Sequence, residues 1–367
     1  MKIIAFYLPQ YHEIEENNRW WGKGFTEWTN VKKATPLMSD HNQPRIPLNE
    51  NYYNLLDIEI RRWQSQIAKK FGIYGFCYYH YWFRGKLLLE KPLEMMLSDG
   101  QPDIPFCLSW ANEPWTRTWD GKNHQVLMEQ DYGEESDWEE HFTYLLRFFL
   151  DHKYIKINNK PVFMIYRLDQ VSNFQRMIHL WNKLAIKKGL EGLYIVQIMN
   201  SFYDIKLDGV DSILNLEPMN TLRFKIPYAE IKYNINRGKS LLAREFYKYT
   251  KKVPIMLLNK IDYDYVWKNI LSREPRGQAA PEIPGAFVDW DNTPRRGGAG
   301  LFIRGASPAK FQAYMGELIQ KASIDYHSDY IFINAWNEWA EGAYLEPDSK
   351  NGYGYLDAIK NALNERE

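Results

Sequence analysis

The chain has 367 residues, enough for two average domains or for one α/β barrel with insertions. Lys plus Arg and Asp plus Glu both number 46, so the net charge is zero and no overall field favours nucleic acid, which we do not expect as a partner. Aromatic residues make up 16%, including 14 Trp and 26 Tyr, a content that suits sugar binding because pyranose faces stack on aromatic planes. A large core would use the same residues.

Other classes of protein find little support in the sequence. Cys77 and Cys107 lie in apolar, strand-like runs and are expected to be reduced thiols. The first ten residues, MKIIAFYLPQ, hold an apolar run too short for a signal peptide or a membrane span, which predicts a cytoplasmic protein. The eight His show no metal-binding spacing and no phosphate-binding glycine loop follows a strand, so neither a metal nor a cofactor is expected.

Short apolar runs alternate with helical patterns along the chain. The runs predict strands at 2–8, 73–79, 104–110, 161–166, 193–199, 212–216, 285–288 and 330–333. Amphipathic spacing predicts helices at 57–70, 88–98, 134–151, 171–188, 240–251, 307–325 and 354–365. The stretch 200–210 shows little helical period and is the weak point of the pattern. This alternation favours one α/β domain over 1–367, a (β/α)8 TIM barrel, rather than an open sheet.

Two connections, after the first and the sixth strands, are much longer than usual barrel loops. The first, 9–54, is rich in Trp, Asn and Pro and is interpreted as a wall of the binding cleft. The second, 218–284, is a predicted insertion. Its part 221–252 carries nine basic and two acidic residues, with aromatics between them. It is either a solvated helical insertion or a docking face for an anionic glycan, a diphosphate-linked lipid carrier or a membrane surface.

Polar and aromatic residues collect directly after the predicted strands, at the carboxyl ends where barrel enzymes place their active sites. The candidates for substrate contact are Tyr7, His80, Trp110, Asn112, Glu113, Arg117, Trp119, Asp120, Trp290, Asn337 and Tyr344. A single residue of this kind is more often a cap or turn residue. The prediction that these residues form one site at the carboxyl ends of the strands therefore depends on the whole pattern.

The segment 330–348, YIFINAWNEWAEGAYLEPD, begins as a buried strand and becomes a cluster of aromatics and acids. Glu338 and Glu341 are three residues apart, so a helical turn after the strand would put both carboxylates on one side, flanked by Trp336 and Trp339. Glycosidic chemistry needs such a pair, one group for the leaving oxygen and one for the anomeric carbon. Carboxylates about 5–5.5 Å apart imply retention and about 6.5–9.5 Å imply inversion; one turn favours the shorter distance.

Two other interpretations of Glu338 and Glu341 remain open. Glu338 and Glu341 could cap a helix in a solvated turn. Alternatively, WANEPW at 110–115 offers a competing centre, because an Asn-Glu-Pro segment often ends a strand in retaining barrel glycosidases and supplies the acid/base. Its strand and the last strand are three steps apart around the predicted barrel, so Glu113 as acid/base with Glu338 as nucleophile is geometrically credible.

Six segments together carry a family resemblance: 6–12 (FYLPQYH), 20–31 (WWGKGFTEWTNV), 75–83 (GFCYYHYWF), 110–113 with 119–121, 290–296 (WDNTPRR) and 334–348. They resemble the glycoside hydrolase family 99-like, or WbsX-like, proteins found among O-antigen and capsule biosynthesis proteins. The resemblance implies a (β/α)8 barrel whose Trp-Asn-Glu-Trp-x-Glu-Gly segment carries both catalytic acids. By analogy with the endo-α-mannosidases, Glu338 deprotonates the sugar 2-hydroxyl, giving an anhydro-sugar, and Glu341 is the acid/base. Ala340 replaces their usual His, so mannose specificity does not transfer.

We therefore expect a cytoplasmic enzyme that acts on glycosidic bonds with retention, using Glu338 and Glu341 on a cell-surface polysaccharide or its lipid-linked precursor. One alternative is a glycosyltransferase of O-antigen, capsule or lipopolysaccharide assembly using the same site. The other is a non-catalytic glycan-binding protein. The expected partners are an oligosaccharide or polysaccharide and, through 221–252, a membrane surface contacted peripherally.

Overall fold

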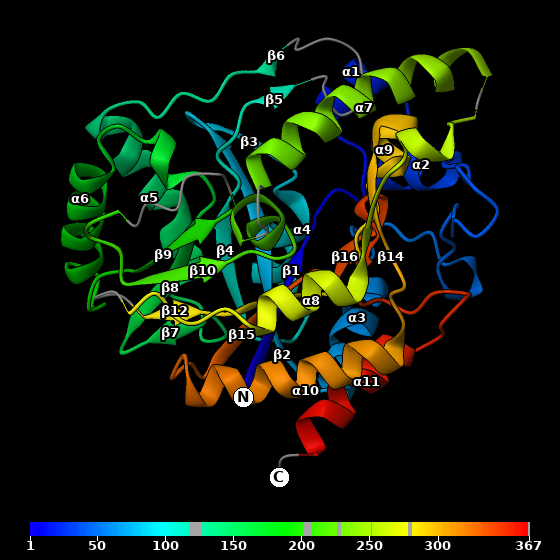
Figure 1. The fold of residues 1–367 in the computed structure, drawn as a ribbon. Helices are drawn as coiled ribbons and strands as arrows, with labels where there is room; N and C mark the ends of the chain where they lie inside the picture. Colours follow the sequence, from blue (N-terminus) through cyan, green and yellow to red (C-terminus); the bar gives the residue numbers. More distant parts are fainter. Residues whose placement is uncertain (117–125, 201–206, 226–228, 251, 278–280, 366–367) are drawn as a thin grey trace.

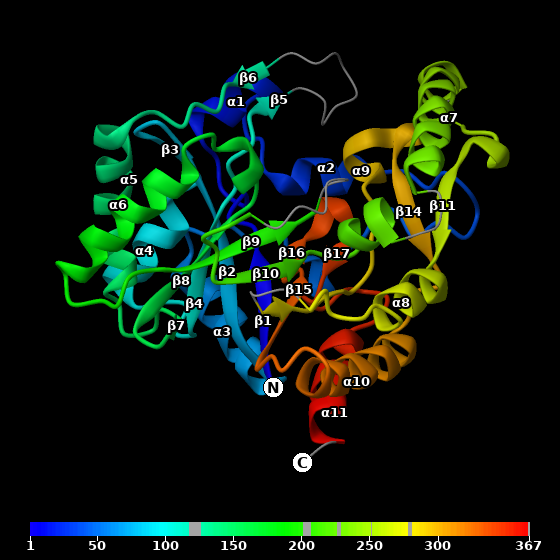
Figure 2. The same cartoon turned by 60° about the vertical axis from the view of Figure 1, so that its left-hand side comes forward.

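The computed structural model describes residues 1–116, 126–200, 207–225, 229–250, 252–277 and 281–365. Nine parallel strands form its main sheet (Figures 1 and 2). In chain order they are β1 Lys2–Tyr7, β2 Ile73–Phe83, β4 Phe106–Trp110, β8 Lys160–Ile165, β9 Tyr194–Met199, β10 Ser212–Asn215, β12 Glu282–Ile283, β13 Gly285–Phe287 and β15 Tyr330–Asn334. They are paired in the order β12-β10-β9-β8-β4-β2-β1-β15-β13, which confirms the barrel expected from the sequence.

The sheet is nearly closed at Pro284, which is the only residue between β12 and β13. β12 pairs with β10 and β13 pairs with β15, so one short run of chain joins the two ends of the sheet. Proline has no amide hydrogen and interrupts a ladder of strand hydrogen bonds, which explains why the run is split. A Cβ at Gly285 would lie 1.8 Å from the carbonyl oxygen of Asn215, so only glycine permits this closure.

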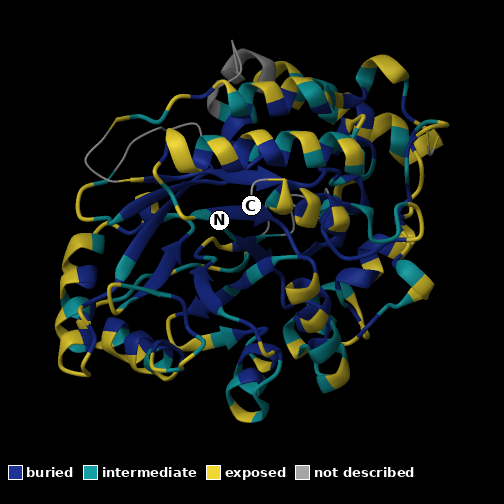
Figure 3. Ribbon diagram, turned by 90° about the horizontal axis from the view of Figure 1, so that it is seen from below, coloured by how far each residue is buried: buried dark blue, intermediate teal, exposed yellow. Residues whose placement is uncertain are grey.

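The strands are apolar because both of their faces are covered. Every residue of β4 and β10 is buried, and so are nine of the eleven in β2. Figure 3 shows the strands as buried ribbons surrounded by helices whose outer faces are exposed. The predicted strands could be recognised for this reason, since a strand covered on both sides needs an uninterrupted apolar run.

The covering helices are α3 Ile58–Lys70, α4 Lys91–Asp99, α5 Glu135–Phe149, α6 Phe174–Ile186, α8 Tyr263–Leu271, α10 Pro308–Ile324 and α11 Gly354–Asn364. Side chains cap three of them: Asp57, Asp262 and Ser307 accept hydrogen bonds from amides in the first turns of α3, α8 and α10. Between β9 and β10 the described residues form no helix, as the weak period at 200–210 suggested.

The second long connection divides into two parts. Its first part contains α7 Ala229–Thr250, which begins well before the predicted helix at 240–251. Its last part, with α8 and β12, belongs to the barrel, because α8 buries Tyr263, Val266 and Trp267 and β12 pairs within the main sheet. The segment that stands apart from the barrel is therefore shorter than the predicted insertion 218–284. Apolar periodicity alone does not separate a barrel helix from an inserted one.

The long loops pack together beyond the carboxyl ends of the strands (Figure 1). The first connection holds α1 Glu15–Trp21 and α2 Glu27–Lys33, and the loop after β13 holds α9 Thr293–Arg296. β11 Asn259–Asp262, which follows α7, pairs with β14 Leu301–Arg304 after α9. A small apolar cluster joins all three loops: Leu37, Ala243, Val253, Leu258 and Phe302.

Shorter strands complete the described structure: β3 Lys86–Leu88, β5 Trp115–Thr116, β6 Val126–Met128, β7 Lys156–Ile157, β16 Asn337–Glu338 and β17 Ala343–Tyr344. Cys77 and Cys107 are free, buried thiols on neighbouring strands. Across the ranges given above, no helix has the length and apolar content of a transmembrane span. In the same ranges no three His, Cys, Asp or Glu side chains are grouped so as to hold a metal ion.

Candidate active site

The acid pair lies in a tight turn that follows β15. After β16 the chain makes one 3₁₀ turn, Trp339–Glu341, and returns antiparallel as β17. Glu338 directly precedes this turn and Glu341 ends it, and both side chains reach Arg295, so they leave the chain on the same side. Gly342 ends the turn at φ 65°, and a Cβ there would lie 2.9 Å from the backbone nitrogen of Asp291. The turn therefore needs glycine at this position.

Hydrogen bonds attach this turn to the end of β1. The Asn337 side chain accepts from the Leu8 amide at 2.7 Å and donates to the Leu8 carbonyl at 3.0 Å. The Tyr11 hydroxyl donates to the Asn337 carbonyl, and the Trp336 amide donates to the Phe6 carbonyl at 2.7 Å. Asn337 is thus a structural clamp that holds Glu338 in place.

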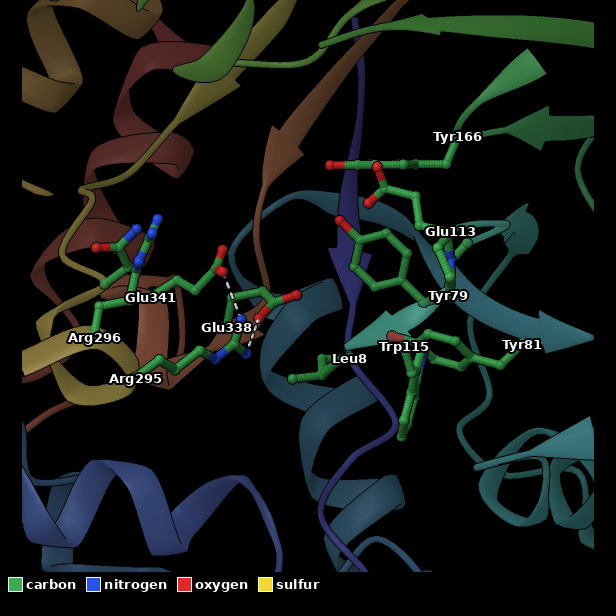
Figure 4. A pocket seen from close by; sticks show the side chains of 13 residues that line it. Leu8, Tyr79, Tyr81, Glu113, Trp115, Tyr166, Arg295, Arg296, Glu338 and Glu341 are labelled. Carbon is green, nitrogen blue, oxygen red and sulfur yellow. Dashed lines mark hydrogen bonds and ion pairs between the residues drawn. The ribbon is translucent and has the colours of Figure 1, made fainter. Parts of the chain in front are cut away.

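A single arginine from α9 contacts three carboxylates, two of which, those of Glu338 and Glu341, are drawn in Figure 4. Arg295 Nη1 donates to Glu341 Oε1 at 2.5 Å, and Nη2 donates to Glu338 Oε2 at 3.1 Å. The same Nη2 donates to Oε1 of Glu27, the first residue of α2. The side chains are 8% exposed for Arg295 and Glu338, 22% for Glu341 and 0% for Glu27. Burial on this scale makes the interactions strong, because little water screens them.

Burial is the largest influence on the protonation of the pair. It raises the pKa of Glu338 and the pKa of Glu341, and the Arg295 charge opposes this by lowering both. The negative charge of Glu27 raises both pKa values further. Two neighbouring carboxyls that are costly to ionise together retain a proton between them. One protonated and one ionised carboxyl near neutral pH are what acid/base chemistry on a glycosidic bond needs.

The pair faces a cavity of about 330 Å³. Its described lining residues are Leu8, Tyr79, Tyr81, Ala111, Glu113, Pro114, Trp115, Tyr166, Asn292, Arg295, Arg296, Glu338 and Glu341. Figure 4 shows two walls: a charged wall with Glu338, Glu341, Arg295 and Arg296, and an aromatic wall with Tyr79, Tyr81, Trp115 and Tyr166. The volume is at the lower end for small-ligand sites. A sugar ring can therefore stack on one wall while its polar groups meet the other.

Glu113 also lies in this cavity, on the aromatic side (Figure 4). Its side chain is 50% exposed, and its Oε1 accepts from Arg167 Nη1 at 3.1 Å. Arg167 also binds Asp169 at 2.8 Å. Glu113 is therefore a partly solvated, ion-paired acid across the cavity from a buried pair. This position suits contact with a sugar, and it leaves the pairing of Glu113 with Glu338 open as a second arrangement.

Several other predicted contact residues have partners inside the protein and do not line the cavity. The Tyr7 hydroxyl donates to Gln64 Oε1 at 2.6 Å, and Trp110 Nε1 donates to the Trp82 carbonyl at 3.1 Å. The Asn112 side chain accepts from the Arg167 amide at 2.7 Å, and the Tyr344 hydroxyl donates to Asp348 Oδ2 at 2.7 Å. His80 lies 2.9 Å from His141 between their Nε2 atoms, and Trp290 is 6% exposed. These side chains stabilise the scaffold.

Strand alternation explains the difference between the expected and the observed lining. Successive side chains of a strand point to opposite faces, so a shift of one residue exchanges lining for core. On β2, Tyr79 and Tyr81 line the cavity while His80 between them is buried against the outer helices. In the segment after β4, where alternation does not apply, Ala111, Glu113, Pro114 and Trp115 line the cavity while Asn112 is buried. Arg117, Trp119 and Asp120 lie outside the described residues.

Sequence reasoning did not assign roles to Glu27, Arg295, Tyr79 or Tyr166, and it placed Tyr81 only among the residues that follow the second strand. Glu27 is an acid in an aromatic run, GFTEW, and Arg295 is one of two adjacent arginines, which were the available signals. The tryptophans expected to flank the acids, Trp336 and Trp339, are instead core residues at 0% and 1% exposure. The described aromatic side chains that face the cavity are instead three tyrosines and Trp115.

Comparison with known proteins agrees with the architecture. The family model described as "Glycosyltransferase WbsX" matches residues 3–359. The chain belongs to the WbsX glycosyltransferase family. Two proteins from strains of Xanthomonas campestris pv. campestris, both described as "Uncharacterized protein WxcX", are 34% identical over 364 residues. The match covers 98% of this WbsX-family chain but 49% of each relative, so the chain spans about half their length.

Solved structures of glycoside hydrolases share the fold. A GH99 endo-α-mannosidase from Bacteroides thetaiotaomicron aligns with a TM-score of 0.56 at 14% identity, covering 99% of this chain and 96% of that one. A structure described as "Glycoside hydrolase-like protein" aligns with a TM-score of 0.58 at 13% identity, covering 98% and 93%. At these identities the likeness concerns the fold. The family model thus gives the family, and the solved structures give the fold.

Proposed function

We propose that the chain breaks a glycosidic bond with retention of configuration, using Glu338 and Glu341 on a cell-surface polysaccharide or its lipid-linked precursor. The observation that carries the proposal is the buried pair sharing Arg295 at the face of a cavity with an aromatic opposite wall. Neighbouring acids on one turn suit the short separation used for retention. A cytoplasmic location, where such precursors are assembled, is part of the proposal.

The two acids take different steps. Glu341 is the more exposed, at 22%, and it gives its proton to the leaving oxygen as the glycosidic C–O bond breaks. Glu338, at 8%, lies deeper, and burial raises its pKa to about 8, so it serves the anomeric side in the form of the pair in which Glu341 carries the shared proton. It either bonds to the anomeric carbon or takes the 2-hydroxyl proton, so that the sugar oxygen makes that bond and an anhydro-sugar forms. Glu341 then deprotonates the water or the acceptor hydroxyl, whose oxygen bonds to the anomeric carbon as the bond to Glu338 or to the 2-oxygen breaks. In the anhydro-sugar route Glu338 returns its proton to the 2-oxygen.

Arg295 supports both steps without reacting. When Glu341 has lost its proton, Nη1 remains at hydrogen-bond distance and stabilises the new carboxylate. Nη2 holds Glu338 Oε2 and directs the other oxygen of that carboxyl. The Glu27 carboxylate fixes the guanidinium from the opposite side.

The direct test replaces Glu341 with Gln, which keeps the shape and removes the titrating proton. The protein is incubated with the surface polysaccharide and the lipid-linked precursor of the producing organism, and products are followed by mass and by NMR of the anomeric proton. We expect product of retained configuration from the wild type, and loss of turnover with sugar affinity preserved in Glu341→Gln. Inverted product, or full turnover by the variant, would contradict the mechanism.

A second candidate is a glycosyltransferase of O-antigen, capsule or lipopolysaccharide assembly that uses the same pair. The family description favours it, because the WbsX family carries that name. The same incubation separates the two, since transfer adds a sugar mass to an acceptor and hydrolysis releases one. A wild type that binds glycans without turning over any of them would indicate a non-catalytic glycan-binding protein.

A further inference from the structure

One helix on the carboxyl-end side of the barrel carries an unusual share of exposed apolar surface. Seven of the fourteen most exposed large apolar side chains among the described residues lie between 235 and 256. They are Ile235, Leu241, Leu242, Phe246, Tyr249, Ile255 and Met256. Tyr249 is 76% exposed and Met256 is 79% exposed. We call the outward surface of 235–256 the α7 face.

The apolar residues are ordered along the helix. Ile235, Leu242, Phe246 and Tyr249 follow one another at intervals of seven, four and three, which places them in one stripe of an α-helix. Ala243 on the inner side is buried. A helix in a globular protein normally turns its apolar stripe inward, and α7 has a second stripe on its exposed surface. A surface of this kind is typical of an interaction site.

The same face is strongly positive. The described basic residues in 235–256 are Arg237, Lys239, Arg244, Lys248 and Lys252, and the acid is Glu245. Arg237, Arg244 and Lys248 repeat at intervals of seven and four and form a basic stripe on the opposite flank of the exposed surface from Leu242, with the exposed Leu241 next to it. The whole chain has no net charge, so positive charge is concentrated here. Long basic side chains beside exposed aliphatic groups match a membrane interface, where the apolar atoms enter the headgroup region and the cations meet phosphate.

The α7 face is connected directly to the catalytic segment. The inner side of α7 packs on Gly297–Ala299, which follow Arg295 and Arg296 in the chain. The Ser240 hydroxyl donates to the Ala299 carbonyl at 3.2 Å, and the Tyr247 ring packs against Gly297. Figure 2 shows α7 outside α9, on the carboxyl-end side of the barrel. Docking through α7 would therefore hold the cavity near the docked surface.

We propose that the α7 face docks the protein onto an anionic membrane surface. The proposal goes beyond the reaction, because docking needs no turnover. A second copy fits the face less well, because a symmetric dimer would bring two positive surfaces together. A nucleic acid would leave the aliphatic stripe without a partner.

The test measures sedimentation with vesicles of phosphatidylcholine alone and of phosphatidylcholine with phosphatidylglycerol. We expect binding to the anionic vesicles that weakens at high salt, since salt screens the exposed charges. Arg237→Glu with Arg244→Glu and Lys248→Glu should weaken binding about tenfold or more. Leu242→Ser with Phe246→Ser and Tyr249→Ser should weaken it independently of salt. All six side chains are at the surface, and thermal unfolding checks that the variants remain folded.

The matched control lies at the end of α6, on the far side of the barrel (Figure 2). Ile186 is 60% exposed there, and exposed Lys187 and Lys188 follow it. Ile186→Ser with Lys187→Glu and Lys188→Glu makes similar changes elsewhere and should leave vesicle binding unchanged. Equal binding by the wild type and both α7 variants would overturn the proposal. So would a dimer that the serine variant dissociates, with no vesicle binding.

Failure of docking and failure of the proposed reaction are distinguishable. The Glu341→Gln variant, which lacks the proposed catalytic acid, should bind anionic vesicles as the wild type does. A protein that binds vesicles but turns over no glycan would retain the docking proposal and lose the proposed function. Turnover of a soluble glycan without vesicle binding would have the opposite meaning.

Discussion

The two walls of the cavity are built in different ways. The charged wall comes from a turn after β15 and from α9, and a buried residue of α2 supports it. Its members are held by one another, through Arg295. The aromatic wall comes from alternate residues of β2, from β5 and from the residue that follows β8, and the core ring of Phe6 packs against Tyr79. The comparison separates a wall whose charges depend on each other, to which the proposed mechanism assigns the chemistry, from a wall of rings, to which it assigns the orientation of the sugar.

The largest expected effect is on the charged wall, at Glu338. Glu338→Gln keeps the side-chain shape and removes the carboxylate that serves the anomeric carbon, so kcat should fall about 10²–10⁴-fold with sugar affinity retained. Stopped assays and a binding titration measure the two quantities. Glu113→Gln is the control from the aromatic side and should change kcat much less. If both variants lose activity equally, the reaction uses acids from both walls, as in the Glu113 and Glu338 arrangement.

The next effect is on stability. Among the described residues, Arg295 is the cation in contact with both Glu27 and Glu338, so Arg295→Gln takes the counter-charge from buried carboxylates. Breaking one side of a buried ion pair costs about 3–5 kcal/mol, and urea unfolding should show a loss of this order. Arg296→Gln is the matched control, because Arg296 is exposed and neighbours Arg295 on the cavity rim. A similar loss in both variants would mean that the charged wall is not held through Arg295.

On the aromatic wall the effect should be smaller and of another kind. Tyr166→Leu removes a ring that faces the cavity, so KM should rise about tenfold with kcat little changed, equivalent to about 1.4 kcal/mol of sugar stacking. Tyr344→Phe serves as control, since Tyr344 stacks on Trp339 in the core with ring centroids 3.8 Å apart. It should leave KM unchanged. A drop in kcat with Tyr166→Leu would give the aromatic wall a part in the chemical step.

The smallest change in activity, measured at the pH optimum, is expected from substitution of Glu27. The negative charge of Glu27 raises the pKa of Glu338 and of Glu341, so Glu27→Gln should lower both. The proposed mechanism uses the form of the pair that holds one proton. When both pKa values fall, that form is populated at lower pH. The pH profile of kcat/KM should therefore shift downward, with loss first on the alkaline side. An unmoved profile would limit Glu27 to a structural role, without influence on the protonation of the pair.

Much of the architecture could be predicted from local patterns. Each of the eight predicted strands lies in the main sheet and is an apolar run because the barrel covers both faces, and six of the predicted helices show their buried side as a repeat of three and four. The 3₁₀ turn at Glu338 and Glu341 follows from their spacing and from the glycine after them. α8 was missed, since its pattern lies inside a long polar connection. The closure of the sheet at Pro284 could not be predicted, because it depends on how strands that are distant in the sequence pair with one another.

The features of the site also divide into those that local sequence predicts and those that depend on tertiary packing. The sequence by itself determined which segment holds the acid pair, because three-residue spacing is a local property. Only the tertiary structure decided what surrounds the pair, because Glu27 and Arg295 are 268 positions apart and meet through the packing of α2 and α9. It also decided that Tyr79 and Tyr81 line the cavity while His80 does not. Successive side chains of a strand point alternately into the cavity and into the core. Which of them face the cavity depends on the register of the strand, which its neighbours in the sheet determine.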